Sequence, residues 1–271
     1  MKRLLAFIVY SNLWISAGAS SFALLFYSLT DTQTSALILW FLFFSTLLTY
    51  TYQRFEKIRK NERTTGPRME WMIRNKNLVY LLLVIGVIGT GVTGIQLSFK
   101  SLIYLLIMGL ISFFYVFKIG HYNLRDLPLL KILLIGLVWA GSCFAIPYFE
   151  LDVSSSFNMF YLSIAGALYI IAITIPFDIR DVEVDEKTKY TIPQIFGPRV
   201  SRVIALVFLA TSCYLFHESK VAINLGFWIG IAITGILIAF STKNRNELFF
   251  SFGVDGLLII LGLTTYLFKI L

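Results

Sequence analysis

The segment FDIRDVEVDEK (Phe177–Lys187) follows an apolar run long enough to span a membrane. It places five carboxylates at the point where an apolar helix would leave the bilayer. Asp178, Asp181 and Asp185 are spaced by three and four residues, so on a helix they fall within about 60° of arc. Carboxylates gathered on one stripe repel one another. The spacing therefore predicts a helix end that needs compensating positive charge.

The composition of the whole chain favours a membrane protein. Of its 271 residues, 58% are hydrophobic and 14% are charged, which is more apolar surface than a soluble domain needs. Apolar runs of about twenty residues predict an all-α integral membrane protein with nine transmembrane helices in a single domain, residues 1–271. We expect these helices near 5–28, 35–54, 77–97, 101–117, 129–149, 157–177, 199–217, 221–241 and 248–270.

Lysine and arginine are distributed unevenly between the two sides of these predicted helices. The amino terminus and the linkers after the second, fourth, sixth and eighth helices hold 20 of the 23, and the other side holds Lys100, Lys220 and Lys269. By the positive-inside rule the amino terminus is expected in the cytoplasm and the carboxyl terminus outside. The net charge of +8 is thus explained by the membrane topology and by a possible anionic substrate, and it does not indicate nucleic-acid binding.

Several smaller features have structural interpretations. Cys143 and Cys213 lie in apolar runs and predict neither a disulfide framework nor a metal site. The apolar run that follows the N-terminal MKR has the outline of a cleavable signal peptide, but it continues to a full span, so we favour an uncleaved first helix. The glycines of the formal G-x-G-x-x-G at 89–94, and the pair Gly226 and Gly230, predict close helix packing, because neither lies after a strand.

The acidic stripe has two interpretations from spacing alone. A divalent cation would offset the repulsion, and Mg²⁺ is usually held by one or two carboxylates together with phosphate oxygens. Arg180, Lys187 and Lys189 lie close enough in sequence to meet further phosphate charge. The alternative is a solvated helix end with local Asp–Lys pairs.

The run FDIRDVEVDEKTKYTIPQIFG resembles the second aspartate-rich motif of the UbiA superfamily of intramembrane prenyltransferases. That motif reads D-x-x-D-x-x-x-D, then a lysine two residues on, then T-x-P-x-x-x-G. The matching positions are Asp178, Asp181, Asp185, Lys187, Thr191, Pro193 and Gly197. One residue is missing in the middle, and Lys189 or Tyr190 stands where the family usually has a second lysine.

The resemblance implies a UbiA-like helical bundle and its chemistry. In that family two aspartate-rich motifs, after helices 2 and 6, hold Mg²⁺ ions that bridge the diphosphate of an isoprenoid donor. The metals stabilise the departing pyrophosphate, and an aromatic or other lipophilic acceptor attacks the allylic cation. Here the resemblance implies Mg²⁺ binding by Asp178, Asp181 and Asp185, with Asp181 and Asp185 catalytic, on the cytoplasmic side of a bacterial inner membrane.

The first aspartate-rich motif departs from the family pattern. The family has N-D-x-x-D-x-x-x-D at the end of helix 2, where this chain has LLTYTYQRFEKIRKNE. The asparagine and the three aspartates are replaced by Thr51, Tyr52, Phe55 and Arg59. Glu56 and Glu62 are close by but displaced, so no carboxylate is kept in register.

Three alternatives follow from this departure. Gln53 and Glu56 share a helix face and could form a weaker metal site. Arg54, Arg59 and Lys60 could instead bind the diphosphate in place of the first metal. The third alternative is that the ionisation chemistry is lost.

Other polar residues are expected near the same membrane edge. Asn12, Tyr115, Lys118 and Lys131 are candidates for substrate contact, although a membrane asparagine also serves interhelical hydrogen bonding and the lysines could snorkel to the interface. Asp255, in the middle of the last predicted helix, is costly there and is expected to be protonated or paired with a neighbouring helix.

The resemblance implies Mg²⁺-dependent transfer of a polyprenyl group from its diphosphate to a lipophilic acceptor. The expected substrate-binding residues are Lys187, Arg54, Lys118, Lys131, Tyr115, Asn12, Gln53 and Glu56. The alternative is a non-catalytic UbiA-like protein that binds an isoprenoid lipid. A transporter is disfavoured, because the two halves show no inverted repeat.

Overall fold

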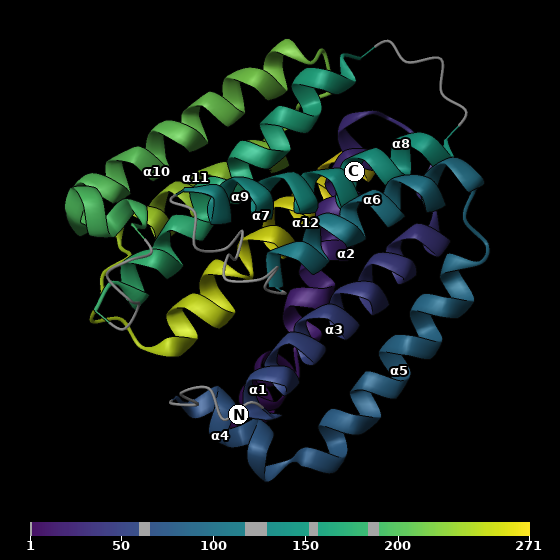
Figure 1. Cartoon of the computed structure of the whole chain (residues 1–271). Helices are drawn as coiled ribbons and strands as arrows, with labels where there is room; N and C mark the ends of the chain where they lie inside the picture. The colour runs from purple at the N-terminus through teal and green to yellow at the C-terminus, as the bar shows by residue number, and fades with distance from the viewer. Residues whose placement is uncertain (1, 60–65, 117–128, 152–156, 184–189) are drawn as a thin grey trace.

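The computed structural model describes residues 2–59, 66–116, 129–151, 157–183 and 190–271, and this part of the chain is a bundle of helices without strands (Figure 1). The elements are α1 (Lys2–Tyr10), α2 (Leu13–Leu29), α3 (Ala36–Arg59), α4 (Pro67–Arg74), α5 (Lys76–Gly94), α6 (Phe99–Val116), α7 (Leu130–Ala140), η2 (Gly141–Ala145), α8 (Ile146–Glu150), α9 (Met159–Asp181), α10 (Ile192–Glu218), α11 (Leu225–Ala239), η4 (Phe249–Val254) and α12 (Leu257–Ile270). The elements η2 and η4 are π-helical.

Six helical segments of the described chain are long and apolar enough to cross a membrane, or seven if the bent pair α1–α2 is one span. They are Ala36–Arg59, Lys76–Gly94, Leu130–Glu150, Met159–Asp181, Ile192–Glu218 and Phe249–Ile270. Two shorter apolar stretches, Phe99–Leu110 and Leu225–Ala239, belong to α6 and α11. All nine predicted segments thus coincide with helices, while nine membrane crossings and the cytoplasmic amino terminus stay predictions.

The first predicted helix, 5–28, is broken rather than continuous. α1 and α2 meet at an angle of 64°, and Asn12 at the junction has a left-handed backbone with φ of 68°. Asparagine tolerates this conformation better than most residues. Its side-chain Nδ2 donates a buried hydrogen bond of 3.0 Å to Thr51 Oγ1 on α3. The break therefore ties the start of the bundle to the end of α3.

The glycines hold neighbouring helices close together, as predicted. A Cβ at Gly230 on α11 would lie 2.9 Å from the Cα of Leu261 on α12, and one at Gly226 would overlap the carbonyl of Thr264. A Cβ at Gly89 on α5 would overlap the ring of Phe44 on α3. Only a residue without a side chain allows these approaches. The predicted packing role is therefore confirmed at Gly89, Gly226 and Gly230, and it is wrong at Gly91, where a Cβ would meet no atom of the described chain within 4 Å.

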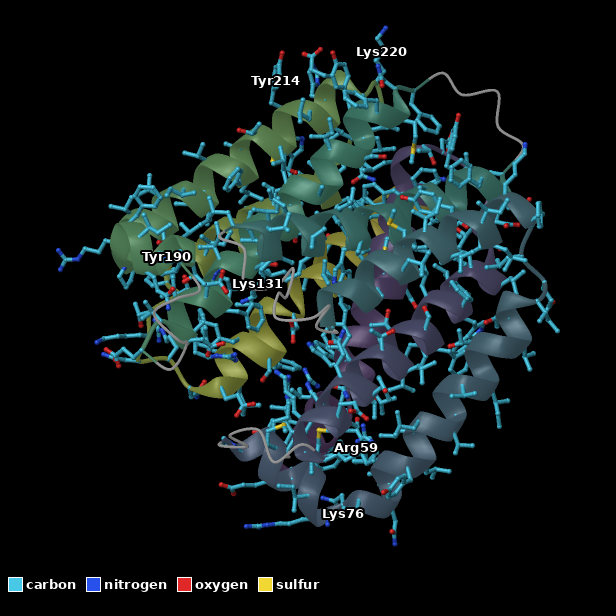
Figure 2. The ribbon with its side chains drawn as sticks, viewed as in Figure 1. Arg59, Lys76, Lys131, Tyr190, Tyr214 and Lys220 are labelled. Carbon is cyan, nitrogen blue, oxygen red and sulfur yellow. The ribbon has the colours of Figure 1, made fainter. Side chains whose placement is uncertain are left out.

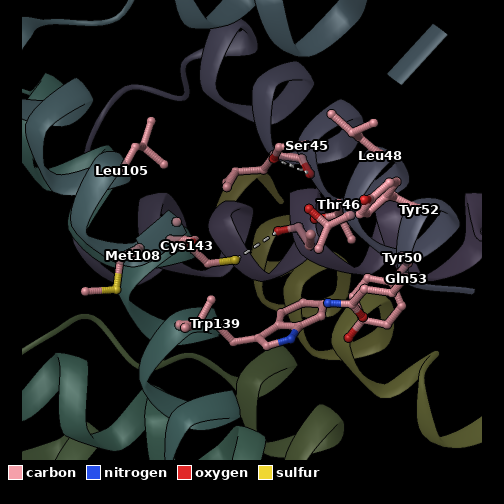
Figure 3. Close-up of a pocket in the computed structure, with 16 residues that line it drawn as sticks. Ser45, Thr46, Leu48, Tyr50, Tyr52, Gln53, Leu105, Met108, Trp139 and Cys143 are labelled. Carbon is pink, nitrogen blue, oxygen red and sulfur yellow. Dashed lines mark hydrogen bonds between the residues drawn. The ribbon is translucent and has the colours of Figure 1, made fainter. Parts of the chain in front are cut away.

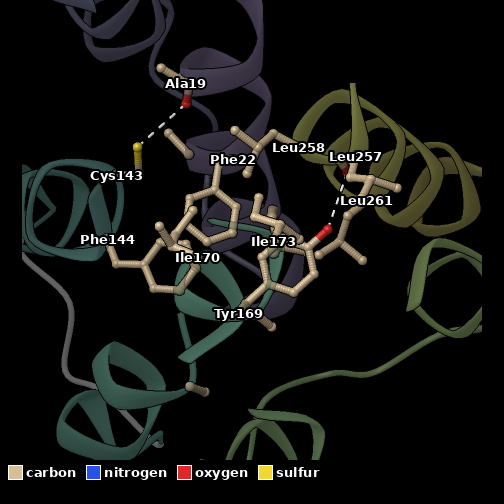
Figure 4. Close-up of a cluster of buried hydrophobic side chains, with 14 of the residues drawn as sticks. Ala19, Phe22, Cys143, Phe144, Tyr169, Ile170, Ile173, Leu257, Leu258 and Leu261 are labelled. Carbon is tan, nitrogen blue, oxygen red and sulfur yellow. Dashed lines mark hydrogen bonds between the residues drawn. The ribbon is translucent and has the colours of Figure 1, made fainter. Parts of the chain in front are cut away.

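The centre of the bundle is a buried aromatic cluster (Figure 4). The Phe22 ring on α2 stacks on Phe144 with centroids 4.8 Å apart and on Tyr169 at 5.7 Å. The buried Tyr169 hydroxyl hydrogen-bonds Thr234 Oγ1 at 3.0 Å. Cys143 is a buried free thiol whose Sγ contacts the Ala19 carbonyl. This core fixes α2, α9 and η2 relative to one another.

Candidate functional site

Charged side chains collect at the end of the bundle where α4 and the carboxyl end of α3 lie. Figure 2 shows Arg59 and Lys76 at this end and Tyr214 and Lys220 at the opposite one. α4 is held there by Trp71, whose ring contacts Phe7 and Tyr10 of α1 edge-on at 6.2 Å. The sequence did not predict α4 as a helix, since it lies in a polar linker. It brings Arg68 to the site.

The acidic half of the site lies on the last turn of α9. Asp178 is buried, with 5% of its side chain exposed, and its Oδ1 accepts a 2.7 Å hydrogen bond from Lys131 Nζ on α7. Asp181 is 37% exposed and accepts two hydrogen bonds, of 2.7 and 2.8 Å, from the guanidinium of Arg180. Both described carboxylates are thus paired with cations of the same chain.

The basic half is built from three arginines around one aspartate. Asp255, directly after η4, lies within electrostatic range of Arg54 on α3, Arg68 on α4 and Arg180 on α9. Arg68 Nε also lies 3.7 Å from a carboxylate oxygen of Glu247. Burial lowers the pKa of Arg68, and the negative charges of Asp255 and Glu247 oppose that shift. Cations of α3, α4 and α9 thus lie within electrostatic range of Asp255, and its pairing or protonation stays a prediction.

Each of these arginines is supported by an aromatic ring. The guanidinium carbon of Arg54 lies 5.6 Å from the ring centre of Tyr50, one turn earlier on α3. Arg68 lies 5.8 Å from the ring of Tyr10. Arg180 lies 5.4 Å from Phe250. A guanidinium stacked on a ring keeps its in-plane N–H groups available, which suits recognition of phosphate.

Three buried polar atoms of this region have no hydrogen-bond partner within the described residues. They are Arg54 Nη1, Arg68 Nε and Asn12 Oδ1. Buried polar atoms without partners are uncommon in folded proteins, and each lost partner costs about 1–3 kcal/mol. The basic half of the site is therefore incompletely satisfied by the protein itself.

An apolar cavity of about 520 Å³ lies beside Tyr50, the residue whose ring is next to Arg54 (Figure 3). It is lined by α2, α3, α6, α7 and η2, among them Tyr50, Gln53, Trp139 and Cys143. Trp139 meets Tyr50 edge-on at 6.3 Å. Because Tyr50 lines the cavity and also lies under Arg54, the apolar space and the basic half share one side chain.

The structure brings some predicted site residues together and separates others. Gln53 lines the cavity, whereas Glu56 is buried and accepts a 2.8 Å hydrogen bond from Arg59. Gln53 and Glu56, which the sequence predicted to act together, therefore have different neighbours although both residues are on α3. Tyr115 lies in the last turn of α6, and its side chain is outside the described part. Asp185, Lys187 and Lys118 also lie outside the described residues.

Sequence reasoning missed the roles of Tyr50 and Arg68. A signal existed for Tyr50, because an aromatic residue four positions before an arginine on a helix places the two side chains together. Nothing in the sequence singles out Arg68 among the eight cations between 54 and 76.

Among the described carboxylates, some suit a magnesium site better than others. They contain no group of three histidine, cysteine, aspartate or glutamate side chains able to hold a metal. Asp181 suits a Mg²⁺ site shared with phosphate oxygens, since its ion pair is partly exposed and weak. Asp178 is committed to Lys131, and Glu56, the nearest carboxylate to the first motif, is taken by Arg59. The described part of the first motif thus offers a metal no carboxylate outside an ion pair, and Glu62 lies outside the described residues.

No protein-family model and no curated protein sequence matches this chain. Solved structures do match over nearly its whole length. A UbiA homologue from Archaeoglobus fulgidus bound to GPP and Mg²⁺ aligns with a TM-score of 0.64 at 11% identity, covering 98% of this chain and 100% of that one. The apo structure of a UbiA homologue from Aeropyrum pernix K1 gives 0.65 at 14% identity, with 94% and 96% covered.

A digeranylgeranylglyceryl phosphate synthase aligns with a TM-score of 0.58 at 16% identity, and the match covers 100% of this chain and 99% of that one. Identities this low establish the fold alone. The predicted resemblance to the UbiA superfamily is confirmed at that level.

Proposed function

From the UbiA fold of this chain, we propose that it binds an isoprenoid diphosphate and transfers the prenyl group to a lipophilic, aromatic acceptor at the cytoplasmic edge of a bacterial inner membrane. The observation that carries this proposal is the shared residue Tyr50, which joins an apolar cavity of about 520 Å³ to a cluster of partly buried arginines. An isoprenoid diphosphate has the same two parts, an apolar chain and an anionic head.

We assign different residues of this chain to the diphosphate and to Mg²⁺. Arg54, Arg68 and Arg180 supply positive charge for the diphosphate, and α9 supplies the carboxylates of Asp178 and Asp181. Mg²⁺ held through Asp181, with Asp185, would supply charge that stabilises the leaving pyrophosphate. Lys118 and Lys187 remain candidates for further phosphate contacts.

The cavity would protect the reacting carbon from water. Its lining is mostly apolar and includes the rings of Tyr50 and Trp139. Aromatic faces attract cations, so these two rings would favour the positive charge that develops as the carbon–oxygen bond breaks. Exclusion of water also directs that carbon to the acceptor rather than to hydrolysis.

Release of pyrophosphate tests the proposal directly. The purified chain in detergent would receive farnesyl or geranylgeranyl diphosphate with Mg²⁺ and an aromatic acceptor. We expect release that falls at least about a hundredfold in Asp181→Ala and in Asp185→Ala, because each change removes charge from the leaving group. Release that is absent, or that neither substitution alters, would contradict an enzymatic role.

A pair of glycine substitutions tests the cavity. Gly109 lines the cavity, and a Cβ there meets no atom of the described chain within 4 Å, so Gly109→Phe fills the cavity without a clash at the backbone. Gly91 on α5 has equally open space but does not line the cavity, which makes Gly91→Phe the matched control. We expect Gly109→Phe alone to weaken binding of long donors by about tenfold or more, and equal affinities would exclude this cavity as the chain site.

One observation favours a second function, binding of an isoprenoid lipid without catalysis. Both described carboxylates of the second motif are already paired with internal cations, and the first motif has none in register. In this case the donor would bind in the presence of Mg²⁺, and no pyrophosphate would be released over hours. The same release assay, run together with a binding measurement, separates the two functions.

A further inference from the structure

We propose that Arg54 and Arg68 form an anion site that holds a phosphate group of the donor without a metal ion. The identity of the ligand as an isoprenoid diphosphate rests on the proposed function. The existence of the site rests on the two arginines and their neighbours and does not depend on the identity of the ligand. Together they carry the same formal charge as one Mg²⁺.

The first argument is that both guanidinium groups hold unused donors. Arg54 Nη1 and Arg68 Nε are buried without hydrogen-bond partners among the described residues. The nearest acid to Arg68, Glu247, lies at 3.7 Å, which is beyond hydrogen-bond distance. Because buried N–H groups are almost always paired, these two indicate an acceptor that the protein does not provide.

The second argument is convergence of separate elements on one point. Arg54 comes from α3 and Arg68 from α4, and each lies on a tyrosine ring that limits its movement. Both lie within electrostatic range of the one carboxylate of Asp255 and of each other. Guanidinium groups fixed in this way bind phosphate oxygens through paired, charge-assisted hydrogen bonds.

The third argument concerns Asn12. It hydrogen-bonds Thr51, which precedes Arg54 by about one turn of α3. Rotating the Asn12 amide by half a turn keeps that bond, with the Thr51 hydroxyl as the donor. The unpaired Oδ1 position then becomes an N–H group. In that second orientation Asn12 would present a donor, as Arg54 and Arg68 do.

Asp255 explains how the site remains stable when no ligand is bound. A carboxylate inside the bundle is unfavourable unless cations compensate it, and two uncompensated arginines would be equally unfavourable. Asp255 lies within electrostatic range of Arg54 and Arg68, so its charge offsets part of theirs. An arriving phosphate competes with that carboxylate for the same guanidinium groups.

Binding of farnesyl thiodiphosphate, which resists ionisation, and of inorganic pyrophosphate tests the site. Both ligands would be titrated into the full chain in detergent, with Mg²⁺ or with EDTA. We expect binding of farnesyl thiodiphosphate to persist in EDTA. Arg54→Ala and Arg68→Ala should each weaken that binding about tenfold or more, since each removes charge-assisted hydrogen bonds.

The matched control is Arg245→Ala, because Arg245 also stacks on a ring, 5.2 Å from Phe249, but is exposed and outside the cluster. Arg54→Lys and Arg68→Lys keep the charge and the fold while removing the planar fork, and should give intermediate affinities. Gel filtration and thermal unfolding of every variant identify any loss of fold.

The possible outcomes separate this inference from the proposed function. Binding that disappears in EDTA, or that is equal in Arg54→Ala, Arg68→Ala and Arg245→Ala, overturns the metal-independent site while leaving the proposed function intact. Arginine-dependent binding of pyrophosphate without binding of the isoprenoid ligand supports the anion site and overturns the proposed function. Absence of binding by both ligands overturns both.

Discussion

The carboxyl ends of α3 and α9 contribute opposite chemistry to the same site. On α9, Asp178 is paired with Lys131 and Asp181 with Arg180. On α3, Arg54 retains a buried nitrogen without a partner in the described part of the chain. The acidic end is satisfied by the protein, whereas the basic end is not.

This difference indicates which end recognises a ligand first. A metal at α9 must compete with ammonium and guanidinium groups that already occupy the carboxylates. An anion at α3 meets donors that are desolvated and fixed, so little further cost arises on binding. In this chain we therefore expect the arginines at the basic end to contribute most to recognition of the donor's diphosphate.

The largest loss of stability is expected at the most buried ion pair of the acidic end. Asp178→Ala leaves Lys131 buried without this carboxylate, and unfolding should become easier by about 3 kcal/mol, at the low end for buried pairs because 27% of Lys131 is exposed. Thermal unfolding in detergent measures the loss. Adding Lys131→Met to Asp178→Ala should restore part of the stability, and an unchanged melting temperature in the single variant would contradict the pairing.

A smaller effect is expected at the basic end. Arg54→Met replaces an incompletely satisfied guanidinium with an apolar side chain of similar length, so ligand-free stability should change by about 1 kcal/mol or less. The same unfolding measurement should show a much larger difference once pyrophosphate is present, because only the arginine protein gains from the ligand. Destabilisation without ligand as large as that of Asp178→Ala would remove the contrast between the two ends.

The smallest change in stability is expected for Asp181→Ala. Its pair with Arg180 is partly exposed and joins adjacent residues, so the loss should be within about 0.5 kcal/mol. The variant should nevertheless lose the Mg²⁺-dependent part of donor binding, which a titration with and without EDTA measures. Unchanged dependence on Mg²⁺ would show that Asp181 is not a ligand.

Hydrophobic runs were enough to predict the position of nearly every long helix. Apolar length is a local property, so the predicted helices lie close to the observed ones. The predicted start near 199 lies just after Gly197, whose φ of 77° interrupts α10 between its short first part from Ile192 and its long second part. The acidic stripe was likewise readable, because Asp178 and Asp181 do lie on the last turn of α9.

What the sequence did not reveal depends on distant contacts. The break at Asn12 is stabilised by Thr51, 39 residues away, and no local pattern predicts it. Arg68 reaches Asp255 only because α4 folds back against α1 and α3. Charged residues in a linker look alike in sequence, so their convergence required the three-dimensional arrangement.

The π-helix η4 makes the site sensitive to chain length as well as to composition. The Asp255 N–H bonds the Phe250 carbonyl five residues back, so this turn contains one residue more than an α-helical turn. Glu247 and Asp255, the two acids that face Arg68, stand on opposite sides of that extra residue. Deleting one residue of η4, such as Gly253, would restore the α-helical phase and turn Glu247 about 100° away from Asp255. Such a deletion would separate the two acids near Arg68 without removing any charged residue from the sequence.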